Sequence, residues 1–176
     1  MKITKKQFRR ALPWLILAVL IILIDQYSKY LILHRLYVGS TYKIAPFFNL
    51  ILSFNQGSAF GFLSQAGGWQ VLFFSAISVL VIVMLSIWLL RLSYPNAWTA
   101  LALSLVIGGA AGNLIDRIRF SMVVDFFDFH IGDWHYATFN VADSAIVIGV
   151  ALLLLQTFIN KKESKKRKVR KKGSQA

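Results

Sequence analysis

Cysteine is absent from this 176-residue chain, and acidic residues are scarce. Without cysteine the chain has no disulfide bond, no thiol catalysis and no cysteine-ligated zinc site. Seven acidic residues stand against twenty Lys and Arg, and hydrophobic residues make up 57% of the chain. That share is far higher than a soluble domain of this length needs for one core. The composition therefore indicates an integral membrane protein.

The apolar residues are concentrated in four long runs, at 11–33, 71–90, 97–115 and 138–159. A helix needs about 20 apolar residues to cross a hydrocarbon core ~30 Å thick, so each run is long enough to span. The polar segment "DQYSKY" follows the first run, where a cleaved signal peptide would have small residues. We therefore predict an all-α membrane protein with four transmembrane helices, the first of them retained.

The distribution of Lys and Arg predicts the orientation of these helices. With four crossings both termini share one side, and fifteen basic residues fall on that side against four in the opposite loops. The positive-inside rule then places both termini in the cytoplasm. The basic tail, 160–176, is expected to lie near anionic lipid headgroups. Because no aromatic residues interleave its charges, we do not expect a nucleic-acid partner.

Six of the seven acidic residues gather at the predicted outer face. Ionisable groups within membrane spans are costly and by default mark a functional site. The sequence therefore predicts a functional site that faces outward. The six acids on that side are Asp25, Asp116, Asp125, Asp128, Asp133 and Asp143.

Some of these acids have a simpler structural interpretation. Asp25 and Lys29 are four apart with the acid first, the favourable order for an ion pair on one helix face. Asp116 and Arg117 follow a helix end, where interfacial anchoring or a loop salt bridge is the ordinary role. The structural interpretation is favoured for both pairs.

A small-residue face lies just before Asp116. Gly108 and Gly112 form a G-x-x-x-G pair, which allows another helix to approach closely. Asn113 follows at once, so a polar cluster is expected at the top of a tight helix contact.

Asp125 and Asp143 are the remaining pair. A loop returning to the membrane would bring them together, with Asp143 five residues, or about 8 Å, into the fourth helix. Two neighbouring carboxyls do not both ionise easily, so one keeps a proton while the other acts as a base. Such a pair would activate water against an amide. The spacing alone leaves ordinary loop capping as the alternative.

Five motifs in order resemble one family. Together they closely resemble the bacterial lipoprotein signal peptidases, or type II signal peptidases, over about residues 12–159. The motifs are "DQYSK" (25–29), "NQGSAFG" (55–61), "GGAAGNLIDR" (108–117), "VVDFFDF" (123–129) and "FNVADSAI" (139–146).

The resemblance implies a fold and a function. The expected fold is a four-helix transmembrane peptidase domain, 11–159, with a small outer β-cradle and a short outer helix. It would lie between a basic cytoplasmic N-terminus, 1–10, and the tail. The first outer loop, rich in Phe with a turn at 55–57, fits the cradle, and "SQAGGW" fits the helix.

The implied enzyme is an intramembrane aspartyl peptidase of the bacterial inner membrane, with no metal or other cofactor. It would cut diacylglyceryl prolipoproteins before the lipidated cysteine, as a monomer among membrane lipids, and globomycin-type peptides would inhibit it.

The resemblance also assigns roles to residues. The implied catalytic aspartates are Asp125 and Asp143, the pair that topology also selects. Asp25, Lys29 and Asp116 are expected to give structural support, and Asp128 to shape a loop. The implied substrate-binding residues are Asn55, Gly57, Asn113, Arg117, Asn140 and Ala142.

Three alternatives belong to other classes. A metal site is suggested by "DFHIGDWH" (128–135), but it lacks the H-E-x-x-H pattern and exposed loop side chains are favoured. A small transporter or proton conductor would need polar groups in both halves of the membrane, whereas the middle two runs carry no charge. A structural assembly factor would cleave nothing.

Overall fold

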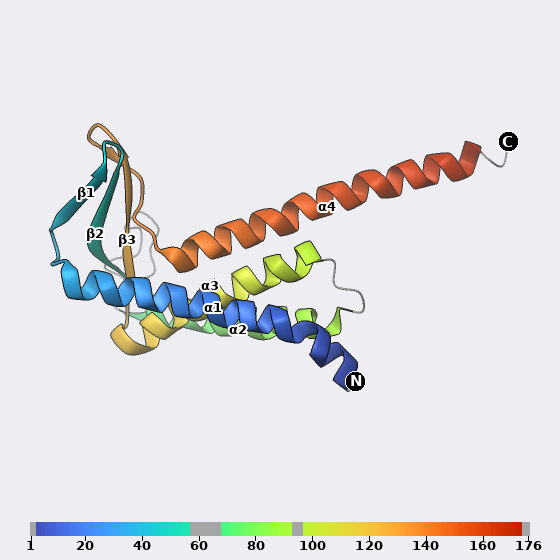
Figure 1. Ribbon diagram of the computed structural model, residues 1–176, viewed down its shortest axis with the longest axis horizontal. Coiled ribbons are helices and arrows are strands. Elements are labelled where there is room, and N and C mark those ends of the chain that lie inside the picture. The colour runs from blue at the N-terminus through green and yellow to red at the C-terminus, as the bar shows by residue number, and fades with distance from the viewer. Residues whose placement is uncertain (1–2, 57–67, 93–96, 174–176) are drawn as a thin grey trace.

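The computed structural model describes residues 3–56, 68–92 and 97–173, with 160–173 described by their backbone only. The described residues contain four helices long and apolar enough to cross a membrane, as the sequence predicts. They are α1 (Lys5–Arg35), α2 (Trp69–Arg91), α3 (Ala97–Phe120) and α4 (Val141–Gly173). The start of α1 and the C-terminal half of α4 lie away from the sheet, which is at the opposite end of the bundle (Figure 1).

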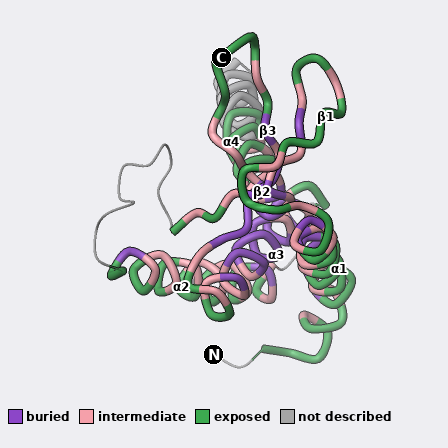
Figure 2. Tube along the Cα trace, turned by 90° about the vertical axis from the view of Figure 1, so that its left-hand side faces the viewer, coloured by how far each residue is buried: buried purple, intermediate pink, exposed green. Residues whose placement is uncertain are grey.

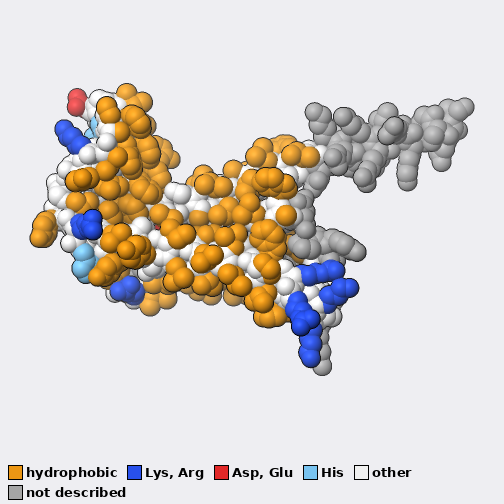
Figure 3. Space-filling model, in the orientation of Figure 1, with side chains coloured by type: hydrophobic (Ala, Val, Ile, Leu, Met, Phe, Trp, Pro, Cys, Tyr) orange, Lys and Arg blue, Asp and Glu red, His pale blue; other side chains and the backbone are white. Residues whose placement is uncertain are grey.

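Helix α3 is the centre of the bundle because it contacts α1, α2 and α4. Figure 2 accordingly shows the buried residues concentrated on α3, whereas α2 is largely exposed. Apolar side chains cover the flanks of the helices, and Lys and Arg lie at the two ends (Figure 3). This distribution is the one expected of helices whose flanks contact lipid.

Glycines bring α1 and α4 close to α3. A Cβ on Gly108 would lie 2.8 Å from the carbonyl oxygen of Ala18 in α1. A Cβ on Gly109 would collide with the carbonyl oxygen of Ala142 in α4. A side chain at either position would push the helices apart, so the predicted small-residue contact is confirmed.

Helix ends differ from the predicted apolar runs where polar side chains cap them. α1 begins at Lys5, six residues before the apolar run, because Thr4 and Gln7 form a capping box. α3 continues to Phe120 and so includes Arg117, which the sequence placed in the outer loop. α4 runs to Gly173 without a break between residues 159 and 160.

A four-stranded antiparallel sheet stands on the helices in the order β1-β2-β3-β4. The first two strands, β1 (Thr41–Ala45) and β2 (Phe48–Asn55), pair antiparallel in the first outer loop, where the small β-cradle was expected. β4 (Trp134–His135) is short. Of the segment "SQAGGW" (64–69), expected to fit the outer helix, residues 64–67 lie outside the described residues, while Gly68 caps α2 and Trp69 begins it.

The third strand, β3 (Val123–Ile131), was not predicted from the sequence, which indicated a loop in this segment. Its pattern "VVDFFDFHI" does not alternate between apolar and polar residues, which is the usual sign of a strand. The structure gives the reason. Val124 and Phe126 pack in a core with Ile32 of α1, while Phe127 and Phe129 contact Phe139. A strand with apolar contacts on both faces loses the period of two.

Candidate active site

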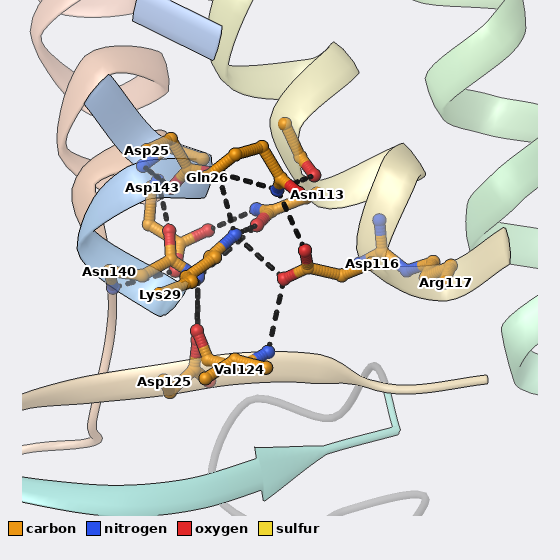
Figure 4. Close-up of polar contacts among 12 residues, drawn as sticks. Asp25, Gln26, Lys29, Asn113, Asp116, Arg117, Val124, Asp125, Asn140 and Asp143 are labelled. Atoms are coloured by element: carbon orange, nitrogen blue, oxygen red, sulfur yellow. Dashed lines mark hydrogen bonds and ion pairs between the residues drawn. The ribbon is translucent and has the colours of Figure 1, made fainter. Parts of the chain in front are cut away.

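Two aspartates from different elements meet where β3 crosses the end of the bundle (Figure 4). Asp125 belongs to β3, and Asp143 to the first turn of α4. Asn140 joins them. Its side-chain Nδ2 donates to Asp125 Oδ1 at 2.7 Å, and its backbone N–H donates to Asp143 Oδ2 at 3.2 Å. Residues eighteen positions apart are thus held in one hydrogen-bonded unit.

Asn140 also fixes the start of α4. Its Oδ1 accepts the backbone N–H of Asp143 at 2.9 Å, which completes the reciprocal pattern of a capping box. Asp143 is therefore the third residue of α4, and the predicted depth of five residues is wrong. The predicted start at Thr138 failed because Phe139 pairs with β3 instead of entering the helix. A carboxylate in the first turn is also favoured by the helix dipole.

Asn113 of α3 connects the aspartates to a buried cation. Its Nδ2 donates to Asp143 Oδ1 at 2.7 Å. Its Oδ1 accepts from Asn140 Nδ2 at 3.2 Å and from Lys29 Nζ at 3.0 Å. The Asn113 side chain thus uses both ends of its amide within the site.

Lys29 forms salt bridges with two carboxylates. Its Nζ lies 2.8 Å from Asp25 Oδ2, as the spacing on one helix face predicts, and 2.8 Å from Asp116 Oδ2. All three side chains are buried. The expectation of an interfacial anchor or loop salt bridge at Asp116 is therefore wrong: its carboxylate turns inward because a buried cation lies between α1 and α3.

The surroundings of Asp125 favour its protonated form. Burial, followed by the nearby charge of Asp143, raises the pKa of Asp125 to about 7. Hydrogen bonds from Asn55 and Asn140, and the charge of Lys29, act in the opposite direction. The group therefore exchanges its proton near neutral pH, as a general acid or base requires.

Arg117 extends from α3 toward α2, away from the centre of the polar network (Figure 4). Its Nη1 donates to Ser78 Oγ at 3.4 Å, and its guanidinium lies 5.7 Å from the centre of the Phe74 ring. Among the described residues its Nε has no hydrogen-bond partner. Arg117 also lines a cavity of about 490 Å³ whose other described walls are Gln56, Gly68, Val71, Leu72, Ser75, Ile118 and Ser121.

The three remaining residues predicted to bind substrate do not all lie beside the two aspartates. Asn55, at the end of β2, donates from Nδ2 to Asp125 Oδ2 at 3.0 Å. Ala142 is fully buried, and its N–H donates to Asp25 Oδ1 at 2.9 Å, so its side chain packs inside the bundle. Gly57 lies outside the described residues.

Asp128 does not lie in a loop, as predicted, but in β3. Its Oδ1 lies 2.7 Å from His135 Nδ1, and its Oδ2 accepts from Asn49 Nδ2 at 2.9 Å. Burial raises the pKa of Asp128, but the hydrogen bonds from His135 and Asn49 and the nearby imidazoles outweigh burial and hold the pKa below its usual value. These contacts hold the β3–β4 hairpin against β2.

Gln26 is a member of the network that the sequence prediction missed. Its Nε2 donates to Asp116 Oδ1 at 2.8 Å and to the carbonyl oxygen of Gly112 at 3.1 Å. The signal was present, since Gln26 is the second residue of "DQYSK". A neutral amide carries no charge, so its position in a membrane span does not by itself indicate a functional site, unlike that of an ionisable group.

This arrangement fits acid–base chemistry on a neutral polar bond. Two carboxyls share one bridging residue, and burial together with the nearby charge of Asp143 raises the pKa of Asp125 above that of a solvated aspartate. Amide donors hold both carboxyls in fixed positions, which is the preorganisation that proton transfer needs.

The chain matches the family model described as "Signal peptidase (SPase) II" over residues 17–159. It is 56% identical over 153 residues to a lipoprotein signal peptidase of Coxiella burnetii (strain Dugway 5J108-111), covering 87% of this chain and 93% of the relative. It is 45% identical over 154 residues to a lipoprotein signal peptidase of Shigella boydii serotype 4 (strain Sb227), covering 88% of this chain and 94% of the relative.

The fold is also similar to solved structures of bacterial membrane enzymes. One of these superposes with a TM-score of 0.77 at 31% sequence identity, covering 86% of this chain and 90% of the solved chain. A second gives a TM-score of 0.72 at 32% identity, covering 82% and 92%. The arrangement of four helices and a small open sheet is thus shared with known membrane enzymes.

Proposed function

Because the chain belongs to the signal peptidase II family of lipoprotein-processing membrane proteases, we propose that Asp125 and Asp143 are its catalytic dyad. The observation that carries this proposal is the double contact of Asn140, which holds both carboxyls in one unit. The proposed substrate is a diacylglyceryl-modified prolipoprotein, cut on the N-terminal side of the lipidated cysteine. The dyad needs no metal and no covalent intermediate.

The proposed reaction begins with one proton on the pair. We assign this proton to Asp125, since its pKa is raised to about 7. The carboxylate of Asp143 takes a proton from water as the water oxygen bonds to the scissile carbonyl carbon. The carbonyl oxygen takes the proton of Asp125, which gives a neutral tetrahedral diol. When the C–N bond breaks, the nitrogen takes the proton from Asp143 and a diol hydroxyl returns one to Asp125. The pair then has its starting protonation.

The other predicted site residues take different parts in this proposal. Asn113 and Asn140 already direct their Nδ2 groups to the aspartates, and Asn55 does the same for Asp125. These contacts support a role in orienting the dyad. Arg117 lines the neighbouring cavity and is our candidate for holding the peptide backbone. Gly57 and Ala142 are proposed to shape the wall through their small size.

We propose that the site lies near the outer face of the bacterial inner membrane. The sheet lies at the end of the bundle opposite the start of α1 (Figure 1). Lys and Arg are most numerous in the first ten residues and in 160–176. With both termini in the cytoplasm, the dyad meets the substrate where the signal peptide leaves the membrane. We further propose that the peptidase domain, 11–159, acts as a monomer. The N-terminus, 1–10, and the tail, 160–176, would contact cytoplasmic lipid headgroups, and globomycin-type peptides would compete for the site.

The lipid is proposed to orient the substrate. Its acyl chains would stay in the bilayer beside the helices while the peptide enters at the sheet end. Binding energy from the lipid would then be used to position the scissile amide on the dyad.

The test uses full-length protein in liposomes and one prolipoprotein prepared with and without its diacylglyceryl group. Mass spectrometry of the products identifies the new N-terminus. We expect cleavage before the lipidated cysteine and a much lower kcat/KM for the unlipidated precursor. Equal rates for the two precursors would contradict lipid positioning. Cleavage at another bond, or none by folded protein, would contradict the proposed function.

A further inference from the structure

The ammonium group of Lys29 is surrounded by three oxygen atoms inside the bundle. An ammonium carries three N–H donors and no acceptor. Lys29 Nζ lies 2.8 Å from Asp25 Oδ2, 2.8 Å from Asp116 Oδ2 and 3.0 Å from Asn113 Oδ1. The side chain is only 3% exposed, so water does not compete for these donors. Nζ thus donates hydrogen bonds to Asp25 Oδ2 and Asn113 Oδ1, and it forms an ion pair with Asp116 Oδ2.

One of these acceptors sets the orientation of an amide. Asn113 Oδ1 accepts from Lys29, and its Nδ2 donates to Asp143 Oδ1 at 2.7 Å. An asparagine side chain has two orientations that differ only by exchange of O and N. The flipped orientation would place an NH₂ group against the ammonium and an oxygen against the Asp143 carboxyl. Lys29 therefore excludes the flipped orientation and keeps a donor on Asp143.

The two carboxylates paired with Lys29 also hold the backbone next to each aspartate of the proposed dyad. Asp25 uses Oδ1 to accept the N–H of Ala142 at 2.9 Å, one residue before Asp143. Asp116 uses Oδ2 to accept the N–H of Val124 at 3.2 Å, one residue before Asp125. Helix α4 and strand β3 are therefore both tied to the same cation next to the residues that carry the dyad.

We propose that Lys29 is a positioning residue of the reaction. Through its contacts with Asp25, Asn113 and Asp116, it fixes the orientation of the Asn113 amide and the relative placement of Asp125 and Asp143. This inference rests on the proposed function. It differs from a purely structural salt bridge, in which Lys29 only balances the charge of Asp25 and Asp116. A structural salt bridge requires only charge, whereas positioning requires N–H donors directed at Asp25 and Asn113 while the same nitrogen stays paired with Asp116.

The substitution that separates these roles is Lys29→Arg. A guanidinium keeps the positive charge but presents its donors in a planar fork, which does not reproduce three contacts spread around one nitrogen. We expect kcat of the folded variant to fall at least about tenfold, since a ~1 Å misplacement costs on the order of 10²-fold in rate. KM and the pH at which kcat is greatest are expected to stay unchanged, because the charge near Asp125 is retained.

A second variant covers the case in which Lys29→Arg does not fold. Nε-methyl-lysine introduced at position 29 keeps the charge and the stem but removes one N–H donor. The matched control is Lys43, an exposed lysine of β1, which is given the same two changes. Each protein is purified in the same detergent, its thermal unfolding midpoint is recorded, and kcat and KM are measured on the lipidated precursor.

A fall in kcat with unchanged KM at position 29, and none at position 43, is the expected result. Wild-type kcat in the folded Lys29→Arg variant would overturn the proposal, and so would wild-type kcat with Nε-methyl-lysine. Asp125→Asn and Asp143→Asn are measured in the same assay. If those two retain cleavage, the proposed dyad fails, and this outcome is distinct from failure of the role given to Lys29.

Discussion

Gly112 connects helix packing to the geometry of the candidate site. A Cβ at this position would lie 2.5 Å from Asp25 Oδ2, the oxygen that accepts from Lys29, and 3.1 Å from Asp25 Cγ. Real Cβ atoms essentially never come within 3.0 Å of another atom, so Gly112→Ala must displace the carboxylate by at least about 0.5 Å. This displacement would reach Lys29 and its contact with Asn113.

Gly149 of α4 provides a matched control away from the site. A Cβ there would lie 2.7 Å from the carbonyl oxygen of Ala102 and 3.1 Å from Leu105 Cβ. The crowding is similar, but Gly149 follows Asp143 by six residues, or about 9 Å along the helix. Overpacking of this kind costs about 1–3 kcal/mol, so both Gly→Ala variants should unfold at lower temperature.

The expected difference lies in catalysis. In addition to losing stability, Gly112→Ala should lower kcat by at least about tenfold, which is ~1.4 kcal/mol of transition-state stabilisation. Gly149→Ala should keep kcat within about twofold of wild type once the folded fraction is measured. The assay combines thermal unfolding in detergent with kcat and KM on the lipidated precursor. Equal kcat values in the two variants would refute the link between the Asp25–Lys29 pair and the dyad.

Two further predictions concern single aspartates. Because the pKa of Asp125 is raised to about 7 in the folded protein, its contribution to stability is present at low pH and is lost as pH rises toward 7. Asp125→Asn should therefore flatten the decline of the unfolding midpoint between pH 5 and pH 8, and an unchanged slope would contradict this. Asp128→Asn removes a hydrogen-bonded carboxylate from the β3–β4 hairpin, at a cost of about 1.5–3 kcal/mol. It should lower the unfolding midpoint and leave kcat of the folded enzyme unchanged, whereas a large fall in kcat would assign Asp128 to the reaction.

The sequence predicts the helical part of this fold well, and the reason is physical. A membrane span is set by the length and polarity of an apolar run, and each of the four runs became a helix. The ends were less predictable because they depend on capping. Thr4 and Gln7 extend α1, and Asn140 delays the start of α4. Such contacts depend on single side chains, which do not change the average hydropathy of a segment.

The site was predictable where neighbours in sequence are neighbours in space. Asp25 and Lys29 pair as their spacing on one helix indicates. The salt bridge between Lys29 and Asp116 joins residues 87 positions apart, so no local sequence pattern predicts it. The strand character of β3 was hidden for a related reason, since its two faces contact elements that are distant in sequence.

The roles of Asp125 and Asp143 are tested most directly by conservative substitution. Wild type, Asp125→Asn and Asp143→Asn are purified folded in detergent and given a diacylglyceryl-modified prolipoprotein, with a chelator present throughout. We predict cleavage before the lipidated cysteine by wild type and none by either variant. Cleavage that survives either substitution, or wild-type cleavage that stops on adding the chelator, would contradict a metal-free aspartate dyad.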